Sequence, residues 1–546
     1  MKVVDAMAEI LKREGVEVIF GYPRNPILDA AAKRDIRPII VRQERTGVHM
    51  ADALSRLTSG ERLGVFTMQT GPGVENSFGG VAQAFSDSVP LILLPSGAPR
   101  ELANTPPNFS ALLNFRHVTK WIEQPSMPSM IPAAMRRAFS QAKNGRLAPA
   151  LVEIPRDLYT MEIPDDFDYA KTMRHRVGPD PVDVTRAAEA LSTAQRPVIY
   201  AGQGIHYAKA WPQLKVLAEL LAAPVFTSLA GKSAFDESHP LALGAGGLSF
   251  SKQLHHFLSN ADIILGIGCS FSTTDFGTAM PAGKRIIHAT LDATDLDKNV
   301  RADLGVLGDA ALTLDLLIAE LRERLRGREQ GHKARVAAEV KRIKEEWLAE
   351  WMPVLTSDAA PLSPYRIIWD LLHTVDVDNT IITHDSGNPR NQIVPFWECR
   401  QPLSYIGWGK STQLGYGLGL ALGAKLAKSD KLCINVWGDA AIGFTGMDLE
   451  TAVRERLPIL SILFNNETMA TEHQSMAIAT EKYRTTDITG NYAAFARSLG
   501  AWSQRVTQAN EVVPAIRAGI AETQAGKPAL IEFMTERSSK RSHYRN

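Results

Sequence analysis

Oxygen-bearing side chains follow two apolar runs in the last third of the sequence. Asp439 comes just after the first run and Gly438, and Asn466 follows the second, with a helical stretch between them. This pattern predicts a βαβ unit whose strand ends open into one crevice, so both side chains are expected to face one site. Their oxygens suit Mg²⁺, and the helix start at Ala440 and Ala441 offers free N–H groups to a phosphate. An ion holding a diphosphate is one interpretation; a helix cap followed by a turn is the other.

A second acid stands at a predicted strand end near the start of the chain. Glu44 follows the run IIVRQ, and a helix rich in small residues, including MADA at 50–53, comes after it. A carboxylate in this place fits a catalytic group, but an ordinary glutamate in the first turn of a helix gives the same pattern.

Alternation of strand and helix organises the whole chain. Strand candidates recur within 1–165, 183–335 and 360–546, and a polar linker ends in Gly-Pro before the second range. Such alternation predicts an α/β protein of three doubly wound parallel-sheet domains. The final predicted strands of the first and third domains, PALVEI and PALIEF, resemble each other and suggest one shared topology. The charged stretch 317–351 is interpreted as one solvated connecting helix.

Composition limits the classes of partner. The chain has 546 residues, 45% of them hydrophobic, and a net charge of +1, which argues against nucleic acid as a main partner. Three scattered cysteines are too few for a disulfide framework or a zinc site. No apolar run approaches the length of a membrane span and the N-terminus is unlike a signal peptide, so a cytoplasmic protein without a membrane partner is expected. The basic segment 537–545 is interpreted as a solvated terminus.

Several separate motifs carry a resemblance to a known family. The stretch from Gly438-Asp439 to Asn465-Asn466 resembles the diphosphate- and Mg²⁺-binding motif of thiamine-diphosphate enzymes, except that Ala440 replaces the second glycine. IFGYP, QTGPGVEN and GKSAFDESHPLALG resemble further segments of acetolactate synthases and their relatives. The chain is thus identified as a member of the superfamily that includes acetolactate synthases, pyruvate decarboxylases and benzoylformate decarboxylases. The resemblance implies that 1–165 binds the pyrimidine, that 360–546 binds the diphosphate and that 183–335 is a Rossmann-like central domain.

The resemblance also implies roles for individual residues. Glu44 would hydrogen-bond the aminopyrimidine and favour its imino tautomer, which promotes loss of the cofactor's C2 proton. Leu414 would be the aliphatic wedge under the bent cofactor. The implied cofactor-binding set is Glu44, Gly387, Asn388, Thr412, Leu414, Gly438, Asp439, Ala440, Ala441, Asn466, Thr468 and Met469. The implied metal ligands are Asp439, Asn466 and the Thr468 carbonyl.

Departures from the relatives bear on the reaction. Arg24-Asn25 replaces a Gly-Gly pair of acetolactate synthases, Ser475 replaces their pocket tryptophan, and 270–275 lacks their arginine-bearing segment. GFTGMDLET at 443–451 resembles oxalyl-CoA decarboxylases and 2-hydroxyacyl-CoA lyases, but another of their segments is missing. Glu472 and Asn25 fall where pyruvate decarboxylases keep acids. The candidate catalytic residues are Glu44, Glu472, Asn25, Arg24 and His473, with Arg24 expected to pair with a substrate carboxylate.

These features predict a thiamine-diphosphate- and Mg²⁺-dependent lyase or carboligase for a 2-oxo acid or a 2-hydroxy ketone. Acetolactate synthase proper with FAD, a CoA-thioester lyase and an idle cofactor-binding homologue are the alternatives. FAD is disfavoured, and Gly202-Gln203-Gly204 is interpreted as a turn rather than a dinucleotide loop. Because the family shares each site between two subunits, a homodimer is the expected minimum and a homotetramer the expected assembly.

Overall fold

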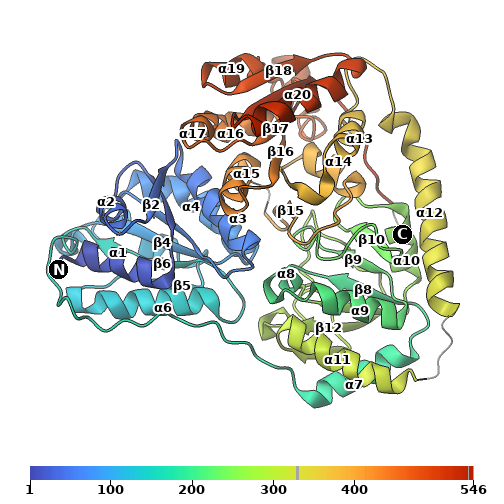
Figure 1. The fold of residues 1–546 in the computed structure, drawn as a ribbon, viewed down its shortest axis with the longest axis horizontal. Coiled ribbons are helices and arrows are strands. Elements are labelled where there is room, and N and C mark those ends of the chain that lie inside the picture. Colours follow the sequence, from blue (N-terminus) through green and yellow to red (C-terminus); the bar gives the residue numbers. More distant parts are fainter. Residues whose placement is uncertain (327–330, 412, 539, 545–546) are drawn as a thin grey trace.

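The computed structural model describes residues 1–326, 331–411, 413–538 and 540–544, which form three α/β units (Figure 1). Each unit has its own parallel sheet, and helices cover both faces of each sheet. The N-terminal unit (blue) lies beside the C-terminal unit (orange and red), and the central unit (green) lies below the latter. The predicted class of three doubly wound parallel-sheet domains is confirmed.

The N-terminal domain has the strand order β2-β1-β3-β4-β6-β5, with β7 paired to β4. Helix α2 begins where Asn25 caps it and Pro26 occupies its first position, the residue types that favour a helix start. The elements are α1 (Val3–Glu14), β1 (Val18–Tyr22), α2 (Pro26–Ala32), β2 (Arg37–Ile40), α3 (Glu44–Leu57), β3 (Gly64–Met68), α4 (Pro72–Ser86), β4 (Leu91–Gly97), α5 (Ala111–Asn114), β5 (Trp121–Glu123), α6 (Ile131–Lys143), β6 (Ala150–Val152) and β7 (Ile154–Pro155).

The central domain has the order β10-β9-β8-β11-β12-β13. In chain order this is 3-2-1-4-5-6, the order of a Rossmann-type sheet. Its elements are α7 (Pro181–Thr193), β8 (Pro197–Ala201), α8 (Gly204–Ala208), α9 (Trp211–Leu221), β9 (Val225–Thr227), β10 (Ala242–Ala245), α10 (Lys252–Asn260), β11 (Ile263–Ile267), β12 (Arg285–Thr290), β13 (Leu304–Leu307) and α11 (Ala310–Arg324).

The C-terminal domain has the order β15-β14-β16-β17-β19-β18, which repeats the N-terminal order strand for strand. The shared topology suggested by the two similar final strands is therefore present, because β6 and β19 hold the same place. Its elements are α13 (Pro364–Thr374), β14 (Thr380–His384), α14 (Asn388–Phe396), β15 (Tyr405–Ile406), α15 (Tyr416–Ala427), β16 (Leu432–Gly438), α16 (Asp439–Thr445), α17 (Leu449–Arg454), β17 (Leu460–Asn465), α18 (Ala477–Tyr483), α19 (Tyr492–Ser498), β18 (Trp502–Val506), α20 (Val512–Gln524) and β19 (Ala529–Met534).

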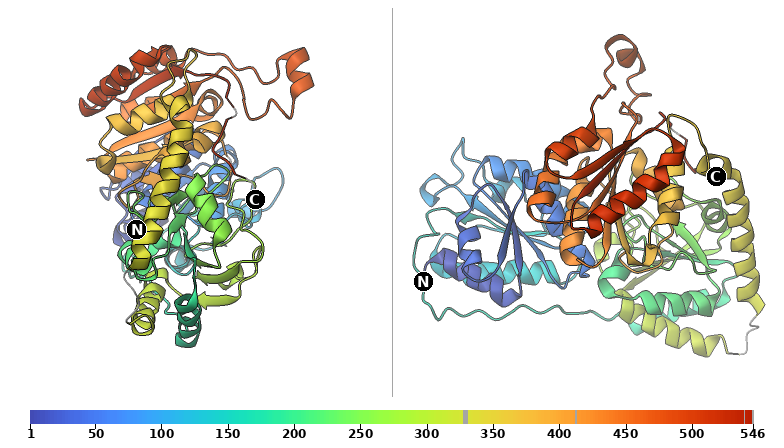
Figure 2. Two further views of the ribbon diagram at one scale, coloured as in Figure 1. Left: turned by 90° about the vertical axis from the view of Figure 1, so that its right-hand side faces the viewer. Right: turned by 45° about the horizontal axis from the view of Figure 1, so that its top comes forward.

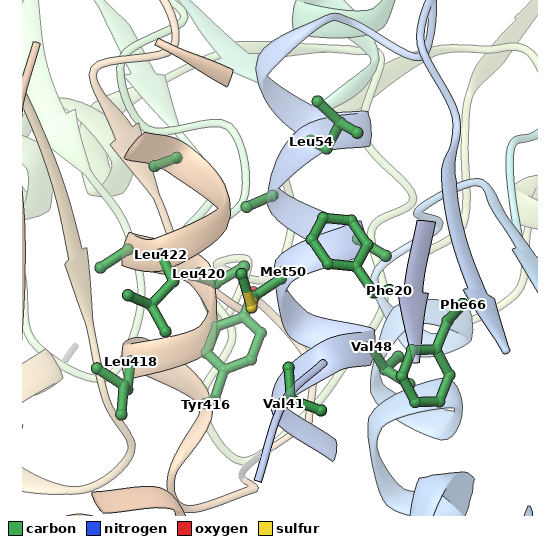
Figure 3. Packing of buried hydrophobic residues seen from close by; sticks show 14 of the residues in the cluster. Phe20, Val41, Val48, Met50, Leu54, Phe66, Tyr416, Leu418, Leu420 and Leu422 are labelled. Carbon is green, nitrogen blue, oxygen red and sulfur yellow. The ribbon is translucent and has the colours of Figure 1, made fainter. Parts of the chain in front are cut away.

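Helices α3 and α15 join the N- and C-terminal domains face to face (Figure 3). Glycines permit the close approach: an added Cβ on Gly423 would lie 2.3 Å from the Met50 carbonyl oxygen, and one on Gly419 would lie 2.6 Å from the His49 Cβ. Leucines of α15 and the apolar residues of α3 form one continuous buried cluster. The contact fixes the start of α3, where Glu44 lies, against the loop that precedes α15.

Two expectations about the later part of the chain are wrong. The stretch 317–351 belongs to two helices, α11 and α12 (Gly331–Leu355), and α12 buries Trp347 and Trp351 because one of its faces packs on α10 and α13. The basic tail is attached to the central domain, since the Ser542 hydroxyl donates to the Phe250 carbonyl (2.7 Å) and the Tyr544 ring stacks on His255. Among the described residues, no helix has the length and apolar character needed to cross a bilayer.

Candidate cofactor site

A cleft of about 1610 Å³ opens at the carboxyl edge of the C-terminal sheet. Three neighbouring strands end there, so segments after β14, β16 and β17 line it together. This is the position at which open parallel sheets bind ligands. The structure brings ten of the predicted cofactor residues to this cleft: Gly387, Asn388, Leu414, Gly438, Asp439, Ala440, Ala441, Asn466, Thr468 and Met469. The catalytic candidate Glu472 lines it as well. Thr412 lies outside the described residues.

Asp439 is the central charged group of the cleft. It is only 4% exposed, and its carboxylate accepts hydrogen bonds from the backbone N–H groups of Ala440 (2.9 Å) and Asn466 (3.2 Å). Burial raises the pKa of Asp439 to about 6. A buried carboxylate without a cationic neighbour is costly, and a divalent ion would relieve that cost.

The remaining oxygens of the predicted metal site lie close by. Asn466 is hydrogen-bonded to Asp439 through its backbone, and its own side-chain oxygen accepts from the Thr468 N–H (3.1 Å). The Thr468 hydroxyl donates to the Thr486 carbonyl (3.1 Å), which leaves the backbone oxygens of the turn as the available ligands. One carboxylate, one amide and a carbonyl are hard oxygen donors, and this set fits Mg²⁺.

Two glycines leave space where a diphosphate would approach the backbone. Gly387 has a φ of +85°, and an added Cβ there would meet no atom within 4 Å, so the glycine serves the conformation and keeps the cleft open. At Gly438 the nearest atom to an added Cβ would be 3.8 Å away. Helices α14 and α16 begin directly after these residues and point their N-termini at the cleft. Exposed N–H groups at helix starts bind phosphate, so the residues present fit thiamine diphosphate.

Asp385 is a site residue that the sequence analysis missed. It is fully buried, and its carboxylate accepts from the N–H groups of Gly415 (3.0 Å) and Gly417 (2.8 Å), which follow Leu414, the predicted wedge residue. Burial raises the pKa of Asp385 to about 6. The group therefore holds this loop in place. A carboxylate directly after a buried strand was the available signal.

The catalytic candidates after β17 lie on a projecting segment. Figure 2 shows the chain around α18 extending away from the body of the molecule. Glu472 is exposed and lines the mouth of the cleft, whereas His473 is exposed and is not among the residues that line it. A proton-transfer role for either side chain stays a prediction.

The N-terminal candidates lie at the carboxyl edge of their own sheet, after β1 and β2. Glu44 begins α3, is only 3% exposed, and has its pKa raised by burial, although a hydrogen bond with Asn76 opposes part of that shift. Arg24 is exposed. None of Arg24, Asn25 and Glu44 lines the Asp439 cleft of the same chain.

The side chain of Asn25 is occupied by structural contacts. Its amide group donates to the Met68 carbonyl (3.2 Å) and the Ser96 hydroxyl (2.9 Å), and its oxygen accepts from the Ile27 N–H (3.1 Å). These bonds cap α2 and fix the ends of β3 and β4. A catalytic role for Asn25 remains untested, and this geometry gives it a structural one.

A second pocket is lined mainly by residues of the central domain. An added Cβ on Gly202 would lie 2.2 Å from the Gly268 carbonyl oxygen, so this glycine serves close backbone packing. The segment 274–278 separates the two spaces, since Gly277 lines the pocket and Phe276 lines the cleft. The Phe276 ring packs edge-on against Trp408, with centroids 5.7 Å apart.

The fold and the strand-end cleft together define a thiamine-diphosphate-binding protein. Three family models match in order: the N-terminal TPP binding domain over 1–127, the central domain over 184–317 and the C-terminal TPP binding domain over 385–533 of the thiamine pyrophosphate enzymes. The chain therefore belongs to the thiamine pyrophosphate enzyme family, as the sequence motifs predict.

Known proteins similar to the chain include acetolactate synthases and a decarboxylase. The probable acetolactate synthase large subunit of Methanocaldococcus jannaschii is 31% identical over 98% of this chain and 92% of its own length. Acetolactate synthase isozyme 3 large subunit of Escherichia coli is 29% identical over 83% of this chain and 80% of its own length. The crystal structure of benzoylformate decarboxylase from Polynucleobacter necessarius superposes with a TM-score of 0.83 at 22% identity, covering 99% of this chain and all of the other. At that identity the superposition supports the fold alone.

Proposed function

We propose that this protein is a thiamine-diphosphate- and Mg²⁺-dependent lyase or carboligase acting on a 2-oxo acid or a 2-hydroxy ketone. The observation that carries the proposal is the buried carboxylate of Asp439, which faces a glycine-lined cleft at three converging strand ends. A family match over all three domains supports the same cofactor.

The residues of the cleft divide into those that bind the ion and those that bind the anion. Asp439, Asn466 and the Thr468 carbonyl would hold Mg²⁺. The backbone after Gly387 and the helix start at Ala440 would hold the diphosphate, and Leu414 would support the bound cofactor from below. When bound, thiamine diphosphate supplies an electron sink for the carbon next to a carbonyl group. The protein contributes position, a dry environment and proton transfer.

Glu44 would be the acid that contacts the pyrimidine of a cofactor bound by a neighbouring copy of the chain. Its burial raises its pKa, which suits a carboxyl group that must share a proton with a ring nitrogen. It does not line the cleft of its own chain, although α3 packs directly on α15 of that chain. We therefore propose that each site combines Glu44 of one copy with Asp439 of another, in a homodimer at minimum and a homotetramer as the expected assembly.

Glu472 and Arg24 would act on the substrate. Glu472 lies at the mouth of the cleft on the projecting segment, where it could transfer a proton to the product. Arg24, on the N-terminal domain, would meet the same site from the partner side and pair with a carboxylate. His473 would be a second group that transfers a proton.

Mixing two inactive variants tests the shared site. Glu44→Gln and Asp439→Ala each disable one half of the site, and we expect each purified variant to be inactive towards a panel of 2-oxo acids. After the subunits are dissociated and reassociated together, mixed dimers contain one intact site, and about a quarter of wild-type activity should return. No recovery, with exchange shown by mass labelling, would place both residues in one copy and reject this arrangement.

Acetolactate synthesis is the second candidate because the similar curated relatives carry that name. In acetolactate synthesis, the carbanion equivalent that remains after loss of CO₂ reacts with a second 2-oxo acid, whereas in simple decarboxylation it takes up a proton. Supplying pyruvate and measuring CO₂, acetaldehyde and acetolactate separates the two outcomes: acetolactate as the main product would select the carboligase.

A further inference from the structure

Arg390 is a buried cation at the edge of the cleft. It lies in the first turn of α14, is only 2% exposed, and lines the cleft together with Gly387 and Asn388. Its guanidinium lies 4.5 Å from the centre of the Phe276 ring and 4.4 Å from that of Trp408. Its Nε donates to the Asn391 side-chain oxygen (2.9 Å).

This cation has no anionic partner among the residues that the structure describes. Its Nη1 is buried and makes no hydrogen bond to any of them. Burial is the main cause that lowers the pKa of Arg390 to about 10, and the nearby Arg541 contributes to that shift. A helix start also disfavours a cation, because the backbone N–H groups there carry a partial positive charge. A buried charge left in this state costs stability, so its retention in the cleft indicates a ligand that pairs with it.

The position of Arg390 separates it from the metal ligands. In the C-terminal sheet the order is β15-β14-β16-β17, and Trp408 follows β15 on one flank of β14. Asp439 and Asn466 follow β16 and β17 on the other flank. The guanidinium packs on Trp408 and thus lies on the β15 side of the cleft, whereas the proposed metal ligands lie on the other side of β14. A different anion is expected on this side of the cleft.

The chemistry of decarboxylation indicates which anionic group an arginine can bind without slowing the reaction. A carboxylate that leaves as CO₂ loses its charge, so an ion pair to it would stabilise the reactant more than the transition state and slow the reaction. An anionic group that stays in the product keeps its charge throughout. A fixed arginine can hold such a group without this penalty.

We infer that Arg390 binds an anionic group that the substrate retains in the product, namely a second carboxylate of the 2-oxo acid donor. The inference rests on the proposed function, because it assigns the substrate class of the same cleft. The guanidinium lies against the rings of both Phe276 and Trp408, and these contacts restrict its position at the edge of the cleft. A planar guanidinium can bind a carboxylate with two parallel hydrogen bonds.

The test compares matched pairs of 2-oxo acids on the holoprotein loaded with thiamine diphosphate and Mg²⁺. Oxaloacetate, 2-oxoglutarate and 2-oxoadipate are each paired with the monocarboxylate of the same chain length. Binding is measured by calorimetry and turnover by CO₂ release. We expect at least one dicarboxylate to bind about tenfold or more tightly than its partner, and Arg390→Gln to abolish that preference while thiamine diphosphate binds within about twofold of wild type.

Two further variants make the outcome decisive. Arg390→Lys keeps the charge without the planar stack and should restore part of the preference. Arg517→Gln removes an exposed arginine of the same domain that does not line the cleft, and it should leave the ratio between paired acids unchanged. Weaker cofactor binding in Arg390→Gln with an unchanged acid ratio would assign the cation to the diphosphate and overturn the inference, as would the absence of any dicarboxylate preference in the wild-type protein. An Arg390-dependent preference in binding without turnover of any acid would reject the proposed function and leave this inference standing.

Discussion

The N-terminal and C-terminal domains share one strand order and carry different chemistry at the same edge. In the C-terminal domain, Asp385, Asp439 and Asn466 follow three strand ends, and Asp439 and Asn466 line an open cleft there. In the N-terminal domain the equivalent edge is largely closed, since Asn25 is bonded to its own strands, and Glu44 is the buried acid that remains. In the proposed site, the C-terminal domain would bind the ligand and the N-terminal domain would deliver a proton-transfer group.

The equivalence extends to the two helices that join the domains. Helix α3 lies between the second and third strands of its domain, as α15 does in the other. Glu44 starts α3, and the loop with Leu414 precedes α15. In the proposed site, the same place in the topology would therefore serve acid–base chemistry in the N-terminal domain and support of the cofactor in the C-terminal domain. A repeated fold allows this division because each domain keeps its own core.

Glu44→Gln gives the sharpest test of the division and the largest expected effect. If the N-terminal domain contributes chemistry alone, turnover and C2-proton exchange of bound cofactor should fall about a thousandfold while thiamine diphosphate binds within a few-fold of wild type. Glu75→Gln removes an exposed carboxylate of the same domain and serves as the control. If Glu44→Gln lowers cofactor affinity by the same factor as it lowers turnover, the N-terminal domain also binds the cofactor, and the proposed division between the domains is wrong.

Asp439→Ala should show the opposite behaviour. Removing the only carboxylate of the proposed ligand set should weaken Mg²⁺-dependent binding of thiamine diphosphate by about a hundredfold, measured by calorimetry with and without the ion. Asp430→Ala, an exposed change in the same domain, should bind normally. If Asp439→Ala retains full ion-dependent affinity, the metal assignment is wrong.

The strand ends that build the site were predictable, because glycines and polar residues interrupt buried apolar runs at Gly438-Asp439 and Asn465-Asn466. The short strands β5, β10, β13, β15 and β18 were not predicted. They lie at or next to sheet edges, where fewer side chains are buried and the apolar run is short. The fold class can be predicted from the longer central strands alone, so the missing edge strands did not affect that prediction.

The roles of Asp385 and Arg390 could not be predicted from the sequence for a different reason. Asp385 stands in a loop that was assigned to the diphosphate, and its actual acceptor role depends on Gly415 and Gly417, thirty residues away in the chain. Arg390 gains its significance from Phe276 and Trp408, which come from another domain and another loop. Motif spacing within one segment contains no information about such contacts, so only the folded arrangement reveals them.

Gly423→Ala tests whether the contact between α3 and α15 holds the two domains in register. The added Cβ would meet the Met50 carbonyl oxygen at 2.3 Å, so we expect a loss of about 1–3 kcal/mol in the free energy of unfolding. Gly443→Ala makes the same change in α16, where an added Cβ meets nothing within 4 Å, and should be neutral or stabilise by up to about 1 kcal/mol. Urea unfolding of both variants measures the difference. Equal effects would mean that the helix contact is loose enough to absorb a methyl group.

The smallest expected effect is the contribution of Asp385, the buried acid behind Leu414, to the pH dependence of stability. Burial raises the pKa of Asp385 to about 6 in the folded protein, above its ordinary value, so the native state binds more protons than the unfolded chain between about pH 4 and 6. This group therefore makes the cofactor-free protein less stable as pH rises through that window, and its contribution levels off above it. Asp385→Asn removes the titration, although it also loses one acceptor for the Gly415 and Gly417 N–H groups.

Thermal unfolding of the wild-type protein and of Asp385→Asn across this pH range gives the contribution as a difference. Asp439 has a similarly raised pKa, but it titrates in both proteins and cancels. The stability advantage of the wild-type protein over the variant should shrink as pH rises from about 4 to 6. Two curves that stay parallel would show that Asp385 does not titrate in this window, and its role in the C-terminal domain would then be that of a permanently charged acceptor.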